Sequence, residues 1–102
     1  MSRIVNDITL VLYDITNNKL RRKIEQAMKD FGVRLQYSVF ICCLDNAGVK
    51  QCHEKLLNVV GQYSHFKEDT DSVIMLRRID LSRLSLILGK NEATEQTAFV
   101  IV

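Results

Sequence analysis

The residue of this sequence best placed for chemistry is Asp14, which follows an apolar stretch and precedes a polar one. Six of the seven residues in 9–15 are apolar, aromatic or β-branched, which is typical of a buried strand. Burying an unpaired carboxylate is costly, so Asp14 should lie at the mouth of the strand, near water, a cation or a donor. An aspartate between a strand and a helix more often forms a turn or caps the helix, and that alternative stays open.

A cluster of basic residues follows Asp14. Between residues 19 and 34, six basic residues stand against two acids, namely Lys19, Arg21, Arg22, Lys23, Lys29 and Arg34 against Glu25 and Asp30. Such a run of charge is most often a solvated helix face. Beside a carboxylate at a strand end, it is also the pattern expected of a surface that binds phosphates.

Several kinds of catalysis find no support in the sequence. Neither His53 nor His65 stands near a recognisable nucleophile motif, and the neighbours Cys52 and His53 would diverge by about 100° on a helix. There is no Walker-type loop, no G-x-G-x-x-G and no H-E-x-x-H. Nucleophilic hydrolysis, nucleoside triphosphate hydrolysis and zinc proteolysis are therefore not expected.

Metal-dependent cleavage of a phosphodiester bond remains. Mg²⁺ prefers oxygen ligands and keeps several waters, so one or two carboxylates suffice where phosphates complete its shell. Asp7 cannot assist Asp14, because seven residues of strand span roughly 23 Å at ~3.3 Å per residue. A two-fold dimer that joins two Asp14 side chains would supply a second carboxylate, and a divalent cation between them would relieve their repulsion.

Periodicity indicates the elements that would position Asp14. Apolar residues recur at helical spacing over 17–31 and again from Asp45 to Tyr63. Gly32 is expected to supply the left-handed residue that ends the first helix. Residues 33–44 alternate with a period of two, and they form either one bent strand or two strands that meet near Ser38.

The rest of the chain predicts further strands. Residues 72–79 have a continuous apolar centre, and 80–90 form either a strand followed by a loop or a weak helical turn. The apolar segment 97–102 must pair with its own sheet or with a partner's sheet. The expected fold is therefore α+β, a ferredoxin-like βαββαβ sandwich with an extra C-terminal strand, in a single domain over 1–102. Because this fold hosts many functions, it does not by itself identify the chemistry.

The composition indicates the class of protein and the compartment in which we expect it. The chain has 47% hydrophobic and 25% charged residues, no proline and four glycines, which is ordinary for a globular domain. We expect no membrane span and no signal peptide. The three cysteines, with no C-x-x-C pair, suggest neither a disulfide framework nor a zinc knuckle, so they are expected to be reduced thiols in a cytoplasmic protein.

Three motifs together resemble a known family. Tyr13-Asp14-Ile15, Leu20-Arg21-Arg22-Lys23 and the run from Gly32 to Phe40 are similar in order and spacing to the small CRISPR-associated endoribonuclease-type proteins. These are the second of the two universal spacer-acquisition proteins of CRISPR systems. The resemblance extends over about residues 8–80.

The resemblance implies a homodimer whose C-terminal strands, about 97–102, pack on the neighbouring protomer's sheet. It implies that the two Asp14 side chains face the dimer axis and bind a shared Mg²⁺, and that metal-activated water cleaves a phosphodiester bond in RNA or DNA. Tyr13 would help to shape this catalytic site. Nucleic acid would be held by Arg21, Arg22, Lys23 and Arg34, and Ser38 and Phe40 would support the site.

Two other functions are weighed beside this nuclease of antiviral defence and spacer acquisition. The resemblance also implies a non-catalytic dimeric scaffold, which bridges dimers of the CRISPR integrase subunit and holds DNA along a basic surface. A third possibility is a ferredoxin-like regulator that binds a small ligand, which predicts an apolar pocket and no use for the basic cluster.

Overall fold

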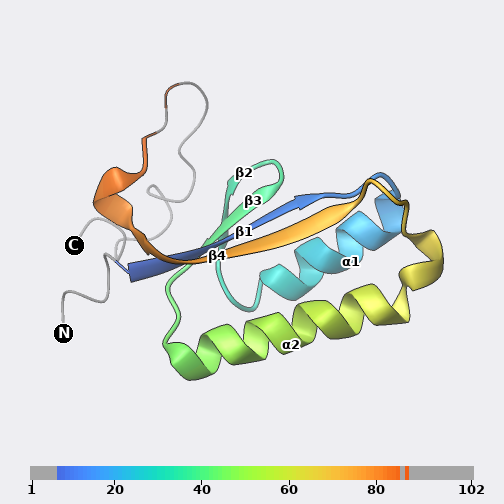
Figure 1. Cartoon of the computed structure of the whole chain (residues 1–102), viewed down its shortest axis with the longest axis horizontal. Helices are drawn as coiled ribbons and strands as arrows, with labels where there is room; N and C mark the ends of the chain where they lie inside the picture. Colours follow the sequence, from blue (N-terminus) through green and yellow to red (C-terminus); the bar gives the residue numbers. More distant parts are fainter. Residues whose placement is uncertain (1–6, 86, 88–102) are drawn as a thin grey trace.

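The computed structural model describes residues 7–85 and 87 of the chain, and their elements follow a βαββαβ order (Figure 1). The ferredoxin-like fold expected from the sequence is confirmed. The terminal strand expected at 97–102 lies outside the described residues. The main elements are β1 (Asp7–Asp14), α1 (Asn18–Met28), β2 (Val33–Gln36), β3 (Val39–Cys42), α2 (Asn46–Gln62) and β4 (Ser72–Asp80).

The four strands form one antiparallel sheet in the order β2-β3-β1-β4. The central strand β1 pairs with β3 on one side and β4 on the other, so that Leu12 lies between Val39 and Ile74. The register between β1 and β4 shifts between Ile8 and Leu10 of β1. On the β4 side of this irregularity, Arg78 adopts a positive φ of 58°. This is the left-handed conformation that a bulged residue can adopt.

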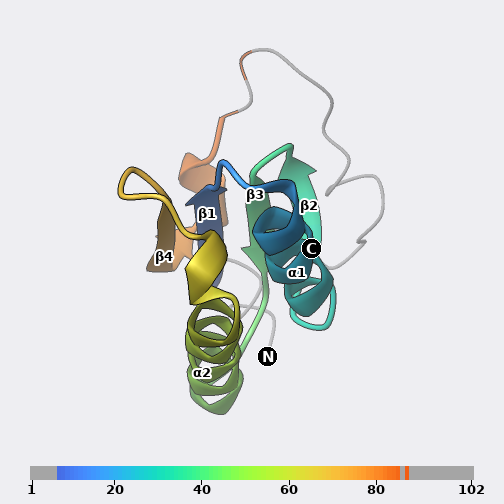
Figure 2. The same ribbon diagram turned by 90° about the vertical axis from the view of Figure 1, so that its right-hand side faces the viewer.

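Both helices cover the same face of the sheet (Figures 1 and 2). Val11 and Tyr13 of β1 point into this layer and are buried. The helices meet them with side chains at helical spacing. Those from α1 are Leu20, Ile24, Ala27 and Met28, and those from α2 are Val49, Cys52, Leu56 and Val59.

Each helix begins at a polar cap. The side chain of Asn17 accepts hydrogen bonds from the backbone N–H groups of Lys19 and Leu20 at 2.8 and 3.1 Å. The side chain of Asp45 accepts one from Gly48 N at 2.7 Å. These bonds satisfy amide groups that have no partner within the helix.

The prediction that Gly32 ends the first helix in a left-handed conformation was wrong. Gly32 has no positive φ, and α1 ends earlier, at Met28, whose carbonyl accepts hydrogen bonds from Phe31 N and Gly32 N. What requires glycine here is space. A Cβ at this position would collide with the carbonyl oxygen of Ile41 and would lie 2.6 Å from Cys42 Sγ.

Residues 33–44 contain two strands, not one bent strand. β2 and β3 form a hairpin whose turn is Tyr37-Ser38, and β3 alternates between the two faces of the sheet. Phe40 packs into the helix-side core, whereas Ile41 packs with Leu35 on the opposite face. The predicted period of two is therefore observed on either side of the turn.

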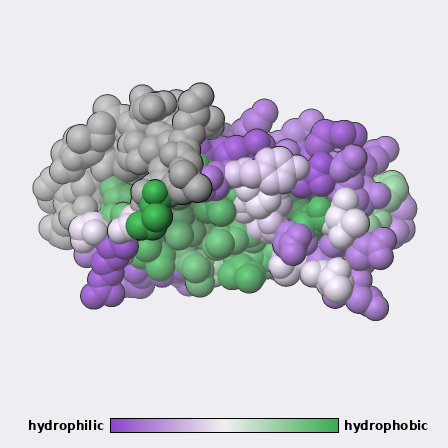
Figure 3. All heavy atoms as spheres, turned by 90° about the horizontal axis from the view of Figure 1, so that it is seen from above, coloured by the Kyte–Doolittle hydropathy of each residue, from purple (hydrophilic) through white to green (hydrophobic). Residues whose placement is uncertain are grey.

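The face of the sheet without helices is apolar. Ile74 and Leu76 of β4 are 50% and 44% exposed there, because their neighbours Val73 and Met75 point toward the helices. Figure 3 views this face and shows a patch of hydrophobic side chains to the left of its centre, with mostly hydrophilic ones on the right. Monomeric proteins rarely expose contiguous apolar patches of large size, so this face is a candidate interface.

Two further observations concern the setting of the protein. Within the described residues, no helix has the length and apolar character needed to cross a membrane. Cys42 and Cys52 are buried and form no disulfide, and burial raises the pKa of Cys42 to about 12 and of Cys52 to about 11. Thiols held so firmly in the protonated form are poor nucleophiles.

Candidate active site at the end of the central strand

Asp14 is the last residue of β1 and lies opposite Ser72 of β4. Its neighbour Tyr13 points into the helix layer, so the alternation of the strand directs Asp14 toward the opposite face. The carboxylate is exposed, and no described residue forms a hydrogen bond or an ion pair with it. Asn17 caps α1 instead, so Asp14 is not the helix cap considered above.

A second carboxylate, Asp71, lies near Asp14 but has a structural role. Its two oxygens accept hydrogen bonds from Glu68 N at 2.9 Å and Thr16 N at 3.0 Å. It therefore ties the loop before β4 to the loop between β1 and α1. The hydrogen bond from Glu68 N, followed by the one from Thr16 N, lowers the pKa of Asp71. Sequence reasoning missed this residue, because the charged loop 67–71 gives no sign that it reaches β1.

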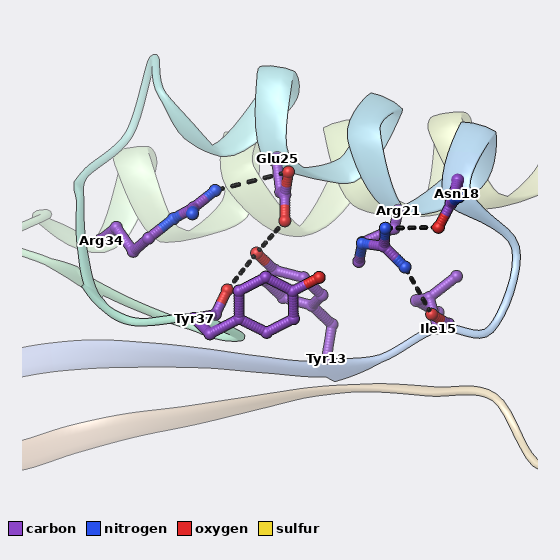
Figure 4. A network of polar contacts seen from close by, with 7 residues as sticks. All are labelled: Tyr13, Ile15, Asn18, Arg21, Glu25, Arg34 and Tyr37. Carbon is purple, nitrogen blue, oxygen red and sulfur yellow. Dashed lines mark hydrogen bonds and ion pairs between the residues drawn. The ribbon is translucent and has the colours of Figure 1, made fainter.

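Tyr13 is buried, and its hydroxyl joins a polar network beneath the surface (Figure 4). The hydroxyl oxygen lies 2.8 Å from Glu25 Oε2 and 3.1 Å from the carbonyl oxygen of Tyr37. Its single proton can be donated fully to only one of them at a time. Burial, reinforced by Glu25, raises the pKa of Tyr13 far above its ordinary value. The side chain stays neutral and has the features of a positioning residue.

Arg34 and Glu25 continue this network. Arg34 Nη2 lies 3.4 Å from Glu25 Oε1, and the guanidinium carbon of Arg34 lies 5.8 Å from the centre of the Phe40 ring. The ion pair links β2 to α1 and engages part of the positive charge of Arg34. Glu25 was counted in the sequence only as an acid among bases, and nothing in its spacing indicated a bond to Tyr13.

Arg21 lies on the same side of α1 as this network (Figure 4). It donates to the carbonyl oxygen of Ile15 at 3.4 Å and to Asn18 Oδ1. Its guanidinium carbon lies 5.9 Å from the centre of the Tyr37 ring. These contacts hold a cation beside the segment that follows Asp14.

The structure divides the predicted basic cluster. Lys23 points toward α2, with its Nζ 5.5 Å from the centre of the Tyr63 ring, in a groove that it lines together with Lys55. Arg22 is exposed. Of the predicted phosphate-binding residues, Arg21 contacts the backbone of Ile15, directly after Asp14, and Arg34 contacts Glu25, which is bonded to Tyr13.

The two predicted supporting residues act in different ways. The carbonyl oxygen of Ser38 accepts a hydrogen bond from Tyr13 N at 3.1 Å, so Ser38 supports the strand end through its backbone. Phe40 is 2% exposed, and its ring centre lies 6.2 Å from that of Tyr13. It supplies part of the core on which Tyr13 rests.

The residues fit a magnesium ion only in part. Within the described part of the chain there is no group of three or more His, Cys, Asp or Glu side chains that could hold a metal. Asp14 alone provides one exposed carboxylate, and Asp71 is engaged by backbone amides. One carboxylate per chain is enough for Mg²⁺ when phosphate oxygens, waters or a second copy complete the shell.

A cavity of about 520 Å³ lies between α2 and β4. Its lining is mainly apolar, including Leu56 and Val60 of α2 and Met75 of β4, with His53 and Arg77 also contributing. Such a pocket is what the small-ligand alternative predicts. None of the basic residues that the sequence singled out lines it.

Comparison with known proteins identifies the family. The model of the family described as CRISPR associated protein Cas2 matches residues 7–83. The chain is 30% identical over 97 residues to a CRISPR-associated endoribonuclease Cas2 of Synechocystis, covering 91% of this chain and 96% of the relative. It is 36% identical over 55 residues to one from Desulforudis audaxviator and 37% identical over 60 residues to one from Moorella thermoacetica.

The last two matches are shorter. They cover 53% and 54% of this chain, and only 52% and 62% of the relatives' own lengths.

Solved structures resemble the whole described fold. Streptococcus pyogenes Cas2 superposes with a TM-score of 0.64 at 26% identity, covering 80% of this chain and 99% of that one. A hypothetical protein from Thermus thermophilus reaches 0.61 at 22% identity, covering 83% of this chain and 93% of that one.

The family match spans most of the chain and includes the strand that carries Asp14, the helix that carries Arg21 and the hairpin that carries Arg34. The family model and the relatives indicate the same family, and a solved Cas2 structure has a similar fold. The chain belongs to the Cas2 family of CRISPR-associated proteins.

Proposed function

We propose that this protein is a CRISPR-associated, metal-dependent endonuclease of antiviral defence and spacer acquisition that hydrolyses phosphodiester bonds in RNA or DNA. The observation that carries the proposal is the exposed carboxylate of Asp14 at the end of the central strand, with which no residue in the described part of the chain pairs. The names of the relatives, CRISPR-associated endoribonuclease Cas2, support the same activity. Those names favour catalysis over the scaffold role.

Mg²⁺ is the metal that we propose for Asp14. The donor is a single hard carboxylate oxygen ligand, without histidine or thiolate, which suits Mg²⁺ better than zinc. When bound, the ion supplies charge neutralisation at the scissile phosphate and activation of water. The second carboxylate would come from Asp14 of another copy of the chain.

The residues around Asp14 have separate tasks in this proposal. Arg21 and Arg34 bind backbone phosphates, because a guanidinium matches phosphate geometry and keeps its charge at any physiological pH. Tyr13 orients the strand end from beneath through its bonds to Glu25 and Tyr37. Arg22 and Lys23 extend the positive surface along α1, where they attract nucleic acid at longer range.

We further propose that two copies associate through the helix-free face of the sheet. Ile74 and Leu76 are exposed large aliphatic side chains on the edge strand β4 of this face, and a second copy would remove them from water. Asp14 points to the same face, so a two-fold axis across it brings the two carboxylates toward each other. The C-terminal segment 97–102 would contribute by pairing with the partner's sheet.

A charge placed on this face should separate the two copies. Ile74→Asp would put a carboxylate into the apolar contact, where it cannot be solvated, and should raise the dimer dissociation constant by about a hundredfold or more. Molar mass measured by light scattering across a dilution series checks this. Leu57→Asp is the matched control, because Leu57 is 62% exposed on α2 and should leave the mass unchanged. Equal masses for both variants would refute this interface.

Metal removal tests the proposed activity. The purified protein should cut labelled single-stranded RNA or double-stranded DNA with Mg²⁺, stop when a chelator is added, and resume when Mg²⁺ is restored in excess. The physical reason is that the carboxylate of Asp14 is itself negative, so a bound cation is needed beside it to neutralise the charge of the scissile phosphate. Cutting that continues at the same rate in chelator would contradict a metal-dependent site.

Two finer assignments complete the proposal. We propose the CRISPR integrase subunit as a protein partner, which the family assignment makes reasonable and which co-purification would test. We also propose a cytoplasmic location, because buried thiols such as Cys42 and Cys52, which form no disulfide, suit a reducing compartment.

A further inference from the structure

Tyr37 is an aromatic side chain that no part of the proposed function uses. It lies in the turn between β2 and β3, and the residue is 64% exposed, although the adjacent positions of the hairpin are mostly buried or half-buried. A tyrosine ring that stays in water does not contribute the favourable free energy of burying a large apolar surface. Such an exposed aromatic beside a candidate nucleic-acid site suggests a binding role.

The backbone that carries this ring is held firmly. The carbonyl oxygen of Tyr37 is within hydrogen-bond distance of the Tyr13 hydroxyl, and the next carbonyl, that of Ser38, accepts from Tyr13 N. Both bonds come from the buried residue directly before Asp14. The exposure of the ring is therefore not the result of a loose turn, and little freedom would be lost when a ligand binds to it.

A cation lies beside the ring. The guanidinium carbon of Arg21 is 5.9 Å from the ring centre, and Figure 4 shows the Tyr37 ring lying between the buried network and Arg21. Because Arg21 belongs to α1, the ring is on the helix side of the sheet, away from the face proposed for dimer contact. It would remain accessible when two copies associate.

We propose that Tyr37 stacks on an unpaired nucleobase while Arg21 binds an adjacent phosphate. The inference rests on the proposed function and adds to it a specificity-determining residue, Tyr37, which would contact the base of an unpaired nucleotide. An aromatic face and a neighbouring cation are the two components with which proteins bind single strands. In a duplex the bases are already stacked on each other, so a tyrosine on the surface cannot reach their faces.

The test compares binding of three ligands in an Asp14→Asn background, which prevents cutting during the measurement. The ligands are a single-stranded oligonucleotide, the duplex of the same sequence, and a single strand whose central residues are abasic. Fluorescence anisotropy at several salt concentrations gives the affinity and its salt dependence. The protein variants are Tyr37→Leu, which removes the aromatic face, Tyr37→Phe, which keeps it, and Arg21→Ala.

Tyr37→Leu should weaken binding of the single strand by about five- to a hundredfold, the range found when one stacked base loses its aromatic partner. Tyr37→Phe should bind like tyrosine, and the duplex should bind all three Tyr37 forms alike. Tyr37→Leu should keep the salt dependence, whereas Arg21→Ala should reduce the slope by about 0.7 for one lost phosphate contact. The abasic strand should bind more weakly to the unchanged Tyr37 protein and lose nothing further with Tyr37→Leu.

Equal binding of the intact and abasic strands to the Tyr37 protein would overturn stacking without reference to any Tyr37 variant. A loss with Tyr37→Leu that is the same for duplex and single strand would also overturn it. Either result leaves the nuclease proposal standing, because that proposal depends on metal-dependent cutting at Asp14. If the protein binds none of the three ligands, both proposals fail.

Discussion

Replacing Asp14 with asparagine should reduce metal-dependent cleavage by about a hundredfold or more. The change keeps the shape of the side chain but removes its charge and most of its affinity for a hard cation. The charge stabilisation supplied by a bound metal amounts to several kcal/mol, and each 1.36 kcal/mol corresponds to a tenfold change in rate. Because Asp14 is exposed and no described residue pairs with it, the free energy of unfolding should change by less than about 0.5 kcal/mol.

The matched control for this prediction is Asp69→Asn, the same chemical change at an exposed position in the loop before β4. Both variants and the unchanged protein would be purified side by side and assayed with Mg²⁺ on single-stranded RNA and double-stranded DNA. Asp69→Asn should retain full activity. An Asp14→Asn protein that cuts as fast as the control would mean that the catalytic carboxylate lies elsewhere.

Gly32→Ala should destabilise the fold by about 2–3 kcal/mol. The new Cβ would collide with the backbone carbonyl of Ile41 and lie 2.6 Å from Cys42 Sγ, so β2 and β3 would have to move apart. Overpacking of this kind costs about 1–3 kcal/mol, occasionally more, and backbone atoms yield less easily than flexible side chains. For a domain of this size the melting temperature should fall by roughly 10–20 °C, measured by circular dichroism.

Gly61→Ala, by contrast, should stabilise the fold. Gly61 lies in the last turn of α2, and a Cβ there would have no neighbour within 4 Å. Alanine is favoured over glycine in a helix by about 1 kcal/mol, so this variant should melt at a higher temperature. If the two substitutions shift the melting temperature by the same amount, the close approach of Gly32 to β3 is not what limits that position.

The helices and strands could be predicted because their periodicities are unambiguous. The stripe from Leu20 to Met28 and the alternation around Phe40 each identify one element and the face that it buries. The hairpin turn at Tyr37-Ser38 left two readings open, because it contains neither glycine nor proline. The role of Gly32 was predicted wrongly, because the local sequence shows that a side chain is missing. It does not show which distant strand occupies the space.

The candidate site was predictable only in part. Asp14 stood out because a charge follows an apolar strand, and Arg21 and Arg34 because cations cluster near it. Glu25 and Asp71 were not foreseen. Glu25 meets Tyr13 from twelve residues away and Asp71 meets Thr16 from fifty-five, and both contacts arise only when the chain has folded. Spacing within one element carries no information about such pairs.

The position of β1 in the sheet also governs the order in which the fold can be completed. β1 pairs with β3 early in the sequence, but its other edge waits for β4, whose residues 72–80 are made roughly sixty residues later. During synthesis from the N-terminus, the central strand of the sheet therefore spends a period with one edge unpaired. Closing so long a loop slows folding, and the strand that carries Asp14 gains its second neighbour last.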